Sequence, residues 1–222
     1  IRAFVIGLLG AESTGKTTLA TALGTALAVP GRRVAVVPEY LREFCERAGR
    51  TPRQDEQADI AAQQSLRIAE AAETHDIVVA DTTALMIAVY SEHVFGDTGL
   101  YDSALTDHAR SSLTLLTALD LPWQADGLQR DGPHVREPVD ARLRAALARA
   151  NVPYRVVYGD GDGRLAQALL AINSVAAHAE AVRVTGSFDS DKRPWRWACE
   201  KCSDPDCEHR LFTGLGLGGA NL

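Results

Sequence analysis

The sequence predicts an α/β fold in which a five-stranded, mostly parallel sheet is covered by helices on both faces. Two observations lead to this fold class. Continuous apolar runs, typical of strands buried on both faces, alternate with segments of helical periodicity. A glycine-containing loop, residues 10–15, separates the first apolar run from the first helical segment. Such alternation implies right-handed crossovers, and therefore a parallel sheet between two layers of helices.

Five short apolar runs are expected to form the strands. The first run ends at Gly10, the third ends at Asp81, and the fourth is followed by Asp120. Their lengths favour strands over helices, which need longer segments. In chain order the expected strands are residues 3–9, 33–37, 77–80, 113–119 and 154–158.

Six segments between and after these runs are expected to be helices. Leu19, Leu23 and Leu27 recur at helical spacing, and the long third segment is rich in Ala and Gln. The last helix is expected to begin in a glycine-rich turn with Asp162 as its N-cap. The expected helices are 16–28, 40–49, 54–73, 83–91, 138–150 and 163–177, with a loop through Gly96 and a mobile loop at 124–136.

Composition indicates a globular protein with one main core. Of the 222 residues, 46% are apolar and 23% are charged, so the chain can bury a sizeable core. We expect a main domain at 1–178 and a small Cys-rich C-terminal appendage at 179–222, where the periodicity fades.

The net charge of −6 argues against nucleic acid and anionic membranes as partners. No apolar run reaches the ~20 residues of a membrane span and no signal-peptide pattern is present, so we expect a cytoplasmic protein, of unknown oligomeric state.

Residues 10–17 match the phosphate-binding pattern G-x-x-x-x-G-K-[ST] and lie between an expected strand and an expected helix. Gly10 and Gly15 let the backbone wrap a phosphate without Cβ clashes, so that N–H groups and the helix N-terminus face the anion. Lys16 is expected to reach the β- and γ-phosphates of ATP, and the Thr17 hydroxyl is expected to hold Mg²⁺. The motif predicts a P-loop NTPase fold. The predicted ATP-binding residues are Gly10, Ala11, Glu12, Ser13, Thr14, Gly15, Lys16, Thr17 and Thr18.

Two classes of P-loop protein are disfavoured by the rest of the sequence. A GTPase requires an Asn-Lys-x-Asp string to read guanine, and the sequence contains none. A ring ATPase usually has a water-polarising Glu directly after its second acidic motif, whereas Asp81 is followed by Thr82 and Thr83. Phosphoryl transfer to a small acceptor remains, a reaction in which one carboxylate orients a substrate hydroxyl and water is excluded.

Acidic and aromatic residues follow the expected strands at the edge where ligands bind. Glu39 follows the second strand, Asp81 follows the third, and Asp120 and Trp123 follow the fourth. The carboxyl ends of parallel strands form the ligand-binding edge of such sheets. Two carboxylates and an aromatic ring beside a P-loop suit Mg²⁺, a ribose-like polyol and a flat ring.

Four strings occur in the order Gly-Ala-Glu-Ser-Thr-Gly-Lys-Thr-Thr at 10–18, Pro-Glu-Tyr-Leu-Arg-Glu-Phe at 38–44, Asp-Thr-Thr at 81–83 and Asp-Leu-Pro-Trp-Gln-Ala-Asp-Gly at 120–127. In these strings the sequence resembles the ribosylnicotinamide kinase domain of NadR-type proteins, an AAA-like family of P-loop kinases related to nucleoside and nucleotide kinases. The resemblance covers roughly residues 3–175. It implies transfer of the ATP γ-phosphate to the 5′-hydroxyl of nicotinamide riboside, which gives nicotinamide mononucleotide in NAD salvage.

The resemblance also implies roles for single residues. Glu39 and Asp81 would hold the riboside hydroxyls or the Mg²⁺ waters, and one of the two would act as the base. Lys16 would take part in catalysis as well as in ATP binding. The residues implied to bind the acceptor are Glu39, Tyr40, Arg42, Trp123, stacked on the pyridinium, and Asp126. Gln64 is a further candidate contact on the long helix, where a solvent-exposed position is the default expectation.

Arg130 and Arg136 lie in or beside the expected mobile loop and would neutralise charge on the moving phosphoryl group. The family pattern Asp-Gly-Leu-Arg is shifted by one residue at 126–130, so the choice between the two arginines stays open. Relatives often carry a DNA-binding segment and an adenylyltransferase domain upstream. Neither is in this sequence, so we expect a protein that stops at the mononucleotide and does not regulate transcription.

Two other functions stay open from the residues alone. One alternative is a kinase for another nucleoside or small metabolite, because the shape of the acceptor pocket does not follow from the sequence. The chain is alternatively an ATP-binding regulator or adaptor, whose P-loop senses ATP and whose Cys-rich tail binds a partner.

The tail carries Cys199, Cys202, Cys207 and His209 in the pattern C-x2-C-x4-C-x-H. Tetrahedral Zn²⁺ favours Cys₃His sets, which predicts a structural zinc site. Because the spacing of the second half is tight, three alternatives stay open: His209 completes the set, Asp204 or Asp206 replaces it, or no metal binds and the tail packs on the main domain as a reduced segment.

Overall fold

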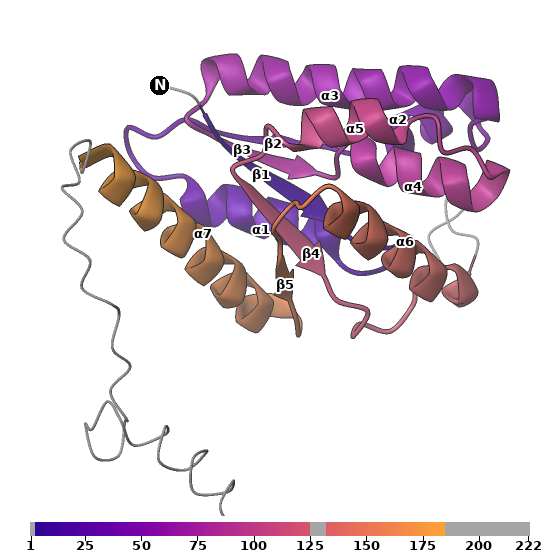
Figure 1. Ribbon diagram of the computed structural model, residues 1–222. Coiled ribbons are helices and arrows are strands. Elements are labelled where there is room, and N and C mark those ends of the chain that lie inside the picture. The colour runs from indigo at the N-terminus through magenta and orange to yellow at the C-terminus, as the bar shows by residue number, and fades with distance from the viewer. Residues whose placement is uncertain (1–2, 125–131, 185–222) are drawn as a thin grey trace, which may run out of the picture. The chain divides into compact units, whose positions relative to one another are not determined.

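A computed structural model describes residues 3–124 and 132–184, with side chains up to residue 177. Its centre is one five-stranded sheet in the order β2-β3-β1-β4-β5, in which every strand pair is parallel (Figure 1). The strands are β1 (Phe4–Leu9), β2 (Val34–Val37), β3 (Ile77–Asp81), β4 (Leu113–Thr117) and β5 (Arg155–Val157). The predicted number of strands, their positions and their direction are confirmed.

The helices agree with prediction except at one element. They are α1 (Lys16–Leu27), α2 (Tyr40–Ala48), α3 (Gln57–Thr74), α4 (Ala84–Phe95), α5 (Tyr101–His108), α6 (Arg136–Arg149) and α7 (Gly161–Val184), with 3₁₀ turns η1 (Gln54–Glu56) and η3 (Pro133–Val135). The sequence analysis missed α5 because the segment is polar. Its buried residues, Tyr101, Ala104 and His108, nevertheless follow helical spacing.

The chain divides into two units, Ile1–Ala181 and Val182–Leu222. The boundary predicted after residue 178 falls inside α7, which continues to Val184. The description below concerns the first unit.

Alternating side chains of the strands pack against two layers of helices. Ile6 and Leu8 of β1 belong to a cluster with Leu23 of α1 and Ile172 of α7. Leu9 faces the other way, into a cluster built from α3, α4, α5 and α6. This double burial explains why β1 is a continuous apolar run, since both faces of a parallel sheet are covered (Figure 1).

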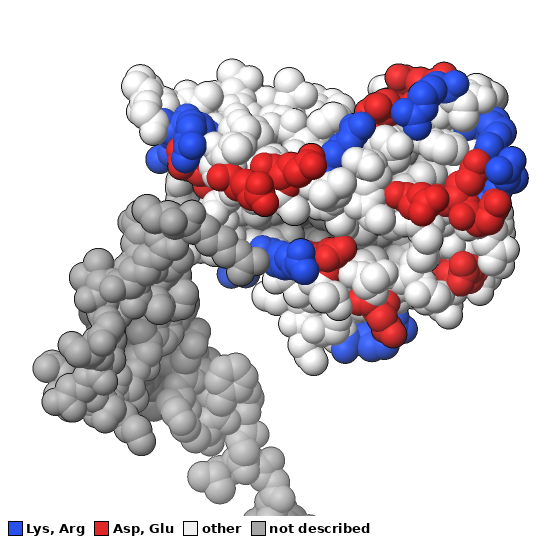
Figure 2. All heavy atoms as spheres, turned by 90° about the horizontal axis from the view of Figure 1, so that it is seen from above, with Lys and Arg blue, Asp and Glu red and all other residues white. Residues whose placement is uncertain are grey.

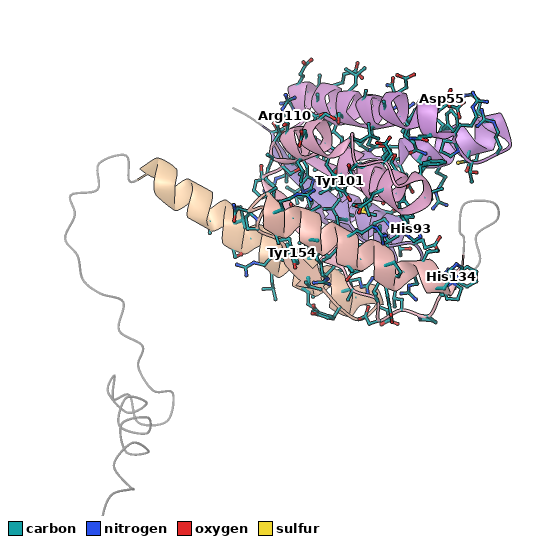
Figure 3. All side chains as sticks on the ribbon, turned by 45° about the vertical axis from the view of Figure 1, so that its right-hand side comes forward. Asp55, His93, Tyr101, Arg110, His134 and Tyr154 are labelled. Atoms are coloured by element: carbon teal, nitrogen blue, oxygen red, sulfur yellow. The ribbon has the colours of Figure 1, made fainter. Side chains whose placement is uncertain are left out.

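Two polar networks tie the helices to each other and to the sheet. The hydroxyl of Tyr101, labelled in Figure 3, donates to Glu92 Oε2 of α4 at 2.6 Å. His108 at the end of α5 is 2% exposed, with Nδ1 3.0 Å from Thr83 Oγ1 and Nε2 2.9 Å from Thr114 Oγ1. His108 therefore connects α5 to the start of α4 and to β4, and the neutral ring satisfies both contacts with one donor and one acceptor.

Burial lowers the pKa of His108 from 6.5 to about 4. The unfolded chain therefore binds more protons than the folded chain between these values, and stability is lost as the pH falls through this window. We expect the free energy of unfolding to fall by about 3 kcal/mol more in the natural protein than in a His108→Gln variant over that range. Urea titrations at several pH values measure this difference, and parallel curves for the two proteins would contradict a neutral buried His108.

No helix in the described part of the chain is long and apolar enough to span a membrane. On the face seen from above in Figure 2, the described Lys and Arg side chains lie among Asp and Glu side chains and form no continuous basic surface.

Candidate active site

The loop between β1 and α1 has the backbone shape that its glycines predict. Gly10 has φ +149°, and an added Cβ would lie 2.1 Å from Thr117 Oγ1 of β4, so only glycine fits there. Gly15 is left-handed at φ +76° and forms the N-cap of α1. Thr14 Oγ1 lies 2.7 Å from Thr117 Oγ1, which fixes the loop to the neighbouring strand. The loop therefore places successive N–H groups at the N-terminus of α1, where an anion binds.

Lys16 folds over this loop. Its Nζ donates to the carbonyl oxygens of Gly10 and Ala11, each at 2.9 Å. Two loop carbonyls thus hold the ammonium group at the loop entrance. A phosphate placed at the helix N-terminus would meet this charge directly.

A buried arginine that the sequence analysis missed supports the loop from behind. Arg164, in the first turn of α7, is 3% exposed. Its Nη1 donates to the Thr14 carbonyl, and its Nη2 donates to Asp120 Oδ1 at 2.6 Å. Asp120 also accepts from the Gly159 backbone N–H. Asp120 is therefore engaged in fixing the loop, which corrects the expectation that it stands with Trp123 at the ligand entrance.

A cavity of about 460 Å³ opens from the loop into the space between α2 and α4. The P-loop contributes Glu12, Ser13, Thr14, Gly15, Lys16, Thr17 and Thr18 to its lining, the apolar lining residues are Leu41, Cys45, Met86, Tyr90, Val94 and Phe95, and the others are Glu39, Arg42, Thr51, Pro52, Gln57 and Thr82. Burial raises the pKa of the Cys45 thiol, so this side chain acts as a neutral part of the wall. The cavity thus brings the phosphate-binding loop together with apolar side chains of α2 and α4, and its volume lies in the range of small-molecule sites.

Of the two predicted acidic residues, Glu39 lines the cavity, and Asp81 directly precedes the lining residue Thr82 without lining the cavity itself. Glu39 is the N-cap residue of α2, and both it and Arg42 line the cavity. Asp81 ends β3 opposite Leu8 of β1 and is 4% exposed. Its Oδ1 is buried and has no hydrogen-bond partner among the described residues. A buried, unpartnered carboxylate oxygen beside a phosphate loop fits a Mg²⁺ ion that is held jointly by protein and phosphates.

Arg136 at the start of α6 lies close to the loop. Its Nη1 donates to the Leu121 carbonyl at 2.9 Å, and an added Cβ at Gly15 would lie 3.0 Å from Leu121 Cδ1. Arg136 is 8% exposed, and its Nε and Nη2 have no partner among the described residues. A buried cation with unused donors suits an anionic ligand.

Three predicted acceptor-site residues do not line the cavity. The centre of the Tyr40 ring lies 4.5 Å from the Arg67 guanidinium, and the Tyr40 hydroxyl accepts from Arg47, so this side chain is held by two residues that do not line the cavity. Gln64 is fully buried and bonds to backbone groups, so neither the substrate contact nor the solvent-exposed position predicted for it is correct. Trp123 is half-buried outside the cavity lining.

The aromatic side chains that do line the cavity are Tyr90 and Phe95 of α4. Residues 83–91 were predicted to be helical, but the sequence carries no signal for which face of that helix lines the cavity. That depends on how α4 packs against α3, α5 and α6, which local periodicity does not encode.

Several predicted sites lie outside the described residues. Asp126 and Arg130 fall in 125–131, and the predicted zinc ligands Cys199, Cys202, Cys207 and His209 fall in 185–222. Within the described residues, no group of three or more His, Cys, Asp or Glu side chains is arranged to hold a metal ion.

The fold is shared with solved kinase structures. A NadR protein in complex with NAD and AMP-PNP is 17% identical in sequence to this chain and superposes with a TM-score of 0.62. The match covers 87% of this chain and 52% of the NadR chain. A NadR protein in complex with NR is 18% identical with a TM-score of 0.64, over 79% of this chain and 50% of that chain. Deoxyadenosine kinase from M. mycoides, with dCMP and dCDP, is 13% identical with a TM-score of 0.56, over 77% of this chain and 100% of that chain.

At these identities the likeness shows the fold, and the chain spans about half the length of the NadR chains that it matches. The comparison with curated proteins gives no match. A family model described as an AAA domain matches residues 5–164, which include the P-loop, Glu39, Asp81 and Arg164. The chain therefore belongs to the AAA domain family, and its fold is that of the P-loop kinases.

Proposed function

We propose that this chain is an ATP-dependent kinase that phosphorylates the 5′-hydroxyl of a nucleoside, and that the nucleoside is nicotinamide riboside. One observation carries the proposal: a single cavity is lined both by the loop that carries Lys16 and by side chains of α2 and α4, which would contact a second ligand. A regulator that only senses ATP has no need of these further contacts. The NadR structures with AMP-PNP and with NR support the choice of the two ligands.

The chain's own residues divide the work of phosphoryl transfer. The backbone N–H groups of residues 12–17 and the Lys16 ammonium bind the β- and γ-phosphates. Thr17 and Asp81 would hold Mg²⁺, which when bound neutralises charge on the phosphate oxygens. Arg136, with its buried unused donors, approaches the transferred group as a further positive charge.

Residues that line the cavity position the acceptor. Glu39 is part of this lining, where its carboxylate accepts the proton of the attacking hydroxyl or orients a ribose hydroxyl. Tyr90 and Phe95 offer aromatic faces to a flat cationic ring, which suits a pyridinium. An acceptor that fills the cavity excludes water, so the γ-phosphate of ATP is transferred to the nucleoside and not to water.

Titration calorimetry with nicotinamide riboside tests this assignment. We expect Tyr90→Ala to weaken riboside binding by about 1–2 kcal/mol, roughly 5- to 30-fold, because one face of the ring loses its aromatic contact. ATP affinity stays unchanged because Tyr90 lines the cavity from α4 and is not part of the phosphate-binding loop. Trp123→Ala, the matched aromatic variant outside the cavity lining, has the smaller effect on riboside affinity. A riboside that does not bind the natural protein, or a larger loss in Trp123→Ala, would contradict this placement of the acceptor.

A further inference from the structure

The pairing of β2 with β3 stops before the residues that carry the two carboxylates. The parallel register of β2 and β3 ends at Val37↔Ala80. Glu39 lies two residues beyond that pair on one segment, and Asp81 lies one residue beyond it on the other, where it is paired only with Leu8 of β1. The β2–β3 ladder therefore does not fix the position of Glu39 relative to Asp81.

The side-chain amide of Gln64 connects the two chain segments that follow β2 and β3. Gln64 comes from α3 and is 0% exposed. Its Oε1 accepts from the Tyr40 N–H at 2.7 Å, while its Nε2 donates to the Pro38 carbonyl at 3.4 Å and to the Thr82 carbonyl at 3.3 Å. The amide thus uses its oxygen and both N–H groups, and all its partners are backbone groups.

These partners lie close in sequence to the two carboxylates. Pro38 and Tyr40 flank Glu39 directly, so Gln64 holds the peptide groups on both sides of that residue. The third hydrogen bond reaches the carbonyl of Thr82, the residue after Asp81, and so holds the 82–83 peptide just beyond the second carboxylate. One buried amide therefore links the backbone on both sides of Glu39 to the segment that follows Asp81.

The backbone at Thr82 also needs such support. Thr82 has φ +82°, a conformation that β-branched residues rarely adopt, and it is 1% exposed. Such a conformation costs of order 1–3 kcal/mol and persists only where surrounding contacts hold it. Gln64 holds the carbonyl of Thr82, and His108 holds the hydroxyl of the next residue, Thr83.

We propose that Gln64 is a positioning residue that sets the spacing and orientation of Glu39 and Asp81, and so couples acceptor binding to Mg²⁺ binding. This inference rests on the proposed kinase function. Gln64 does not line the cavity and touches neither ligand. Its effect is confined to the two acidic strand ends, because the P-loop is held independently by Thr117 and Arg164.

The test compares Gln64→Met, which keeps the side-chain volume without the hydrogen bonds, with Gln63→Met on the adjacent position of the same helix. In Gln64→Met we expect kcat to fall by roughly 10- to 100-fold and the Mg²⁺ concentration for half-maximal rate to rise, because misplaced catalytic groups lose their alignment. ATP affinity in the absence of Mg²⁺ stays the same. Amide exchange measured by NMR becomes faster at Tyr40, whose N–H loses its acceptor. Gln63→Met changes none of these quantities.

Each outcome decides a separate point. If Gln64→Met is folded and exchanges faster at Tyr40, yet keeps the natural kcat and Mg²⁺ dependence, the positioning role is wrong. A loss of ATP affinity in step with kcat is general damage and also overturns it. If Gln64→Met does not fold, Gln64→Glu is measured in its place, because it keeps the acceptor for the Tyr40 N–H and removes both donors. We then expect kcat to fall while amide exchange at Tyr40 stays slow. An unchanged kcat in Gln64→Glu overturns the proposal. Absence of nucleoside phosphorylation by the natural protein refutes the proposed function itself.

Discussion

Lys16→Ala is expected to reduce acceptor-dependent ADP formation by about 100-fold or more. The ammonium group of Lys16 is held at the loop entrance by the carbonyls of Gly10 and Ala11, where it meets the phosphates that carry the developing charge. Removing this charge weakens stabilisation of the transition state more than it weakens ground-state binding. Steady-state rates at saturating ATP and acceptor measure the effect.

Thr25→Ala is the matched control for this variant. Thr25 lies on the same helix, α1, and its exposed hydroxyl donates only to the Thr21 carbonyl at 3.2 Å. We expect it to retain the natural rate. Full activity in a folded Lys16→Ala protein would show that the P-loop of this chain does not carry phosphoryl transfer.

Asp81→Asn is expected to lower kcat by about 100- to 1000-fold, because the amide keeps the shape of the side chain but removes the buried charge that would hold Mg²⁺. Asp81 is 4% exposed with an unpartnered Oδ1, so no other described side chain compensates for it at that oxygen. Titration calorimetry should show that Mg²⁺ no longer strengthens ATP binding, while metal-free ATP binds as before.

The opposite end of the same strand offers the control. Asp76 precedes β3, is exposed, and pairs with Arg33 at 2.8 Å, an ion pair that lowers the pKa of Asp76 to about 2. Asp76→Asn removes an equal charge from the same strand without touching the cavity, and its kcat is expected to be natural. Equal losses in the two variants would mean that Asp81 acts through the fold and not through the metal.

The P-loop, the buried strands and the acidic residues at the strand ends could be predicted because short sequence patterns determine them. The P-loop motif requires Gly10 and Gly15 at fixed spacing, and their positive φ angles show why. The apolar run of β1 follows from burial on both faces of the sheet. Because parallel strands bring their carboxyl ends to one edge, the expectation that Glu39 and Asp81 lie at the edge of the sheet that carries the loop followed from their places at the ends of predicted strands.

The residues that were missed or misplaced depend on contacts between distant segments. Arg164 reaches Thr14 across 150 positions of sequence, and nothing in its neighbourhood distinguishes it from a surface arginine. Gln64 was predicted as a candidate substrate contact, with a solvent-exposed position as the default, but α3 directs this residue inward, where its side chain bonds to the backbone at Tyr40 and Thr82. Tyr40 was assigned to the acceptor site from its motif, whereas two arginines on the helix surface hold its ring outside the cavity.

The α5 helix was also missed because it depends on contacts between distant segments. Its buried residues are spaced helically, but one of the three is a histidine, and its neighbours are mostly polar. The stability of this helix comes from Tyr101 and His108 bonding to α4 and β4, which is tertiary information. Short helices of this kind gain their stability from packing more than from propensity.

The acceptor dependence of ADP release is the most direct test of the account. Purified protein is incubated with ATP, Mg²⁺ and one acceptor at a time, chosen from nicotinamide riboside, adenosine, cytidine and thymidine, and the products are quantified by mass spectrometry. We expect one nicotinamide mononucleotide for each ADP, a kcat/KM for the riboside at least about tenfold above that of the other nucleosides, and little ADP without an acceptor. ADP formed at the same rate with and without any nucleoside, and no phosphorylated product, would contradict the kinase function.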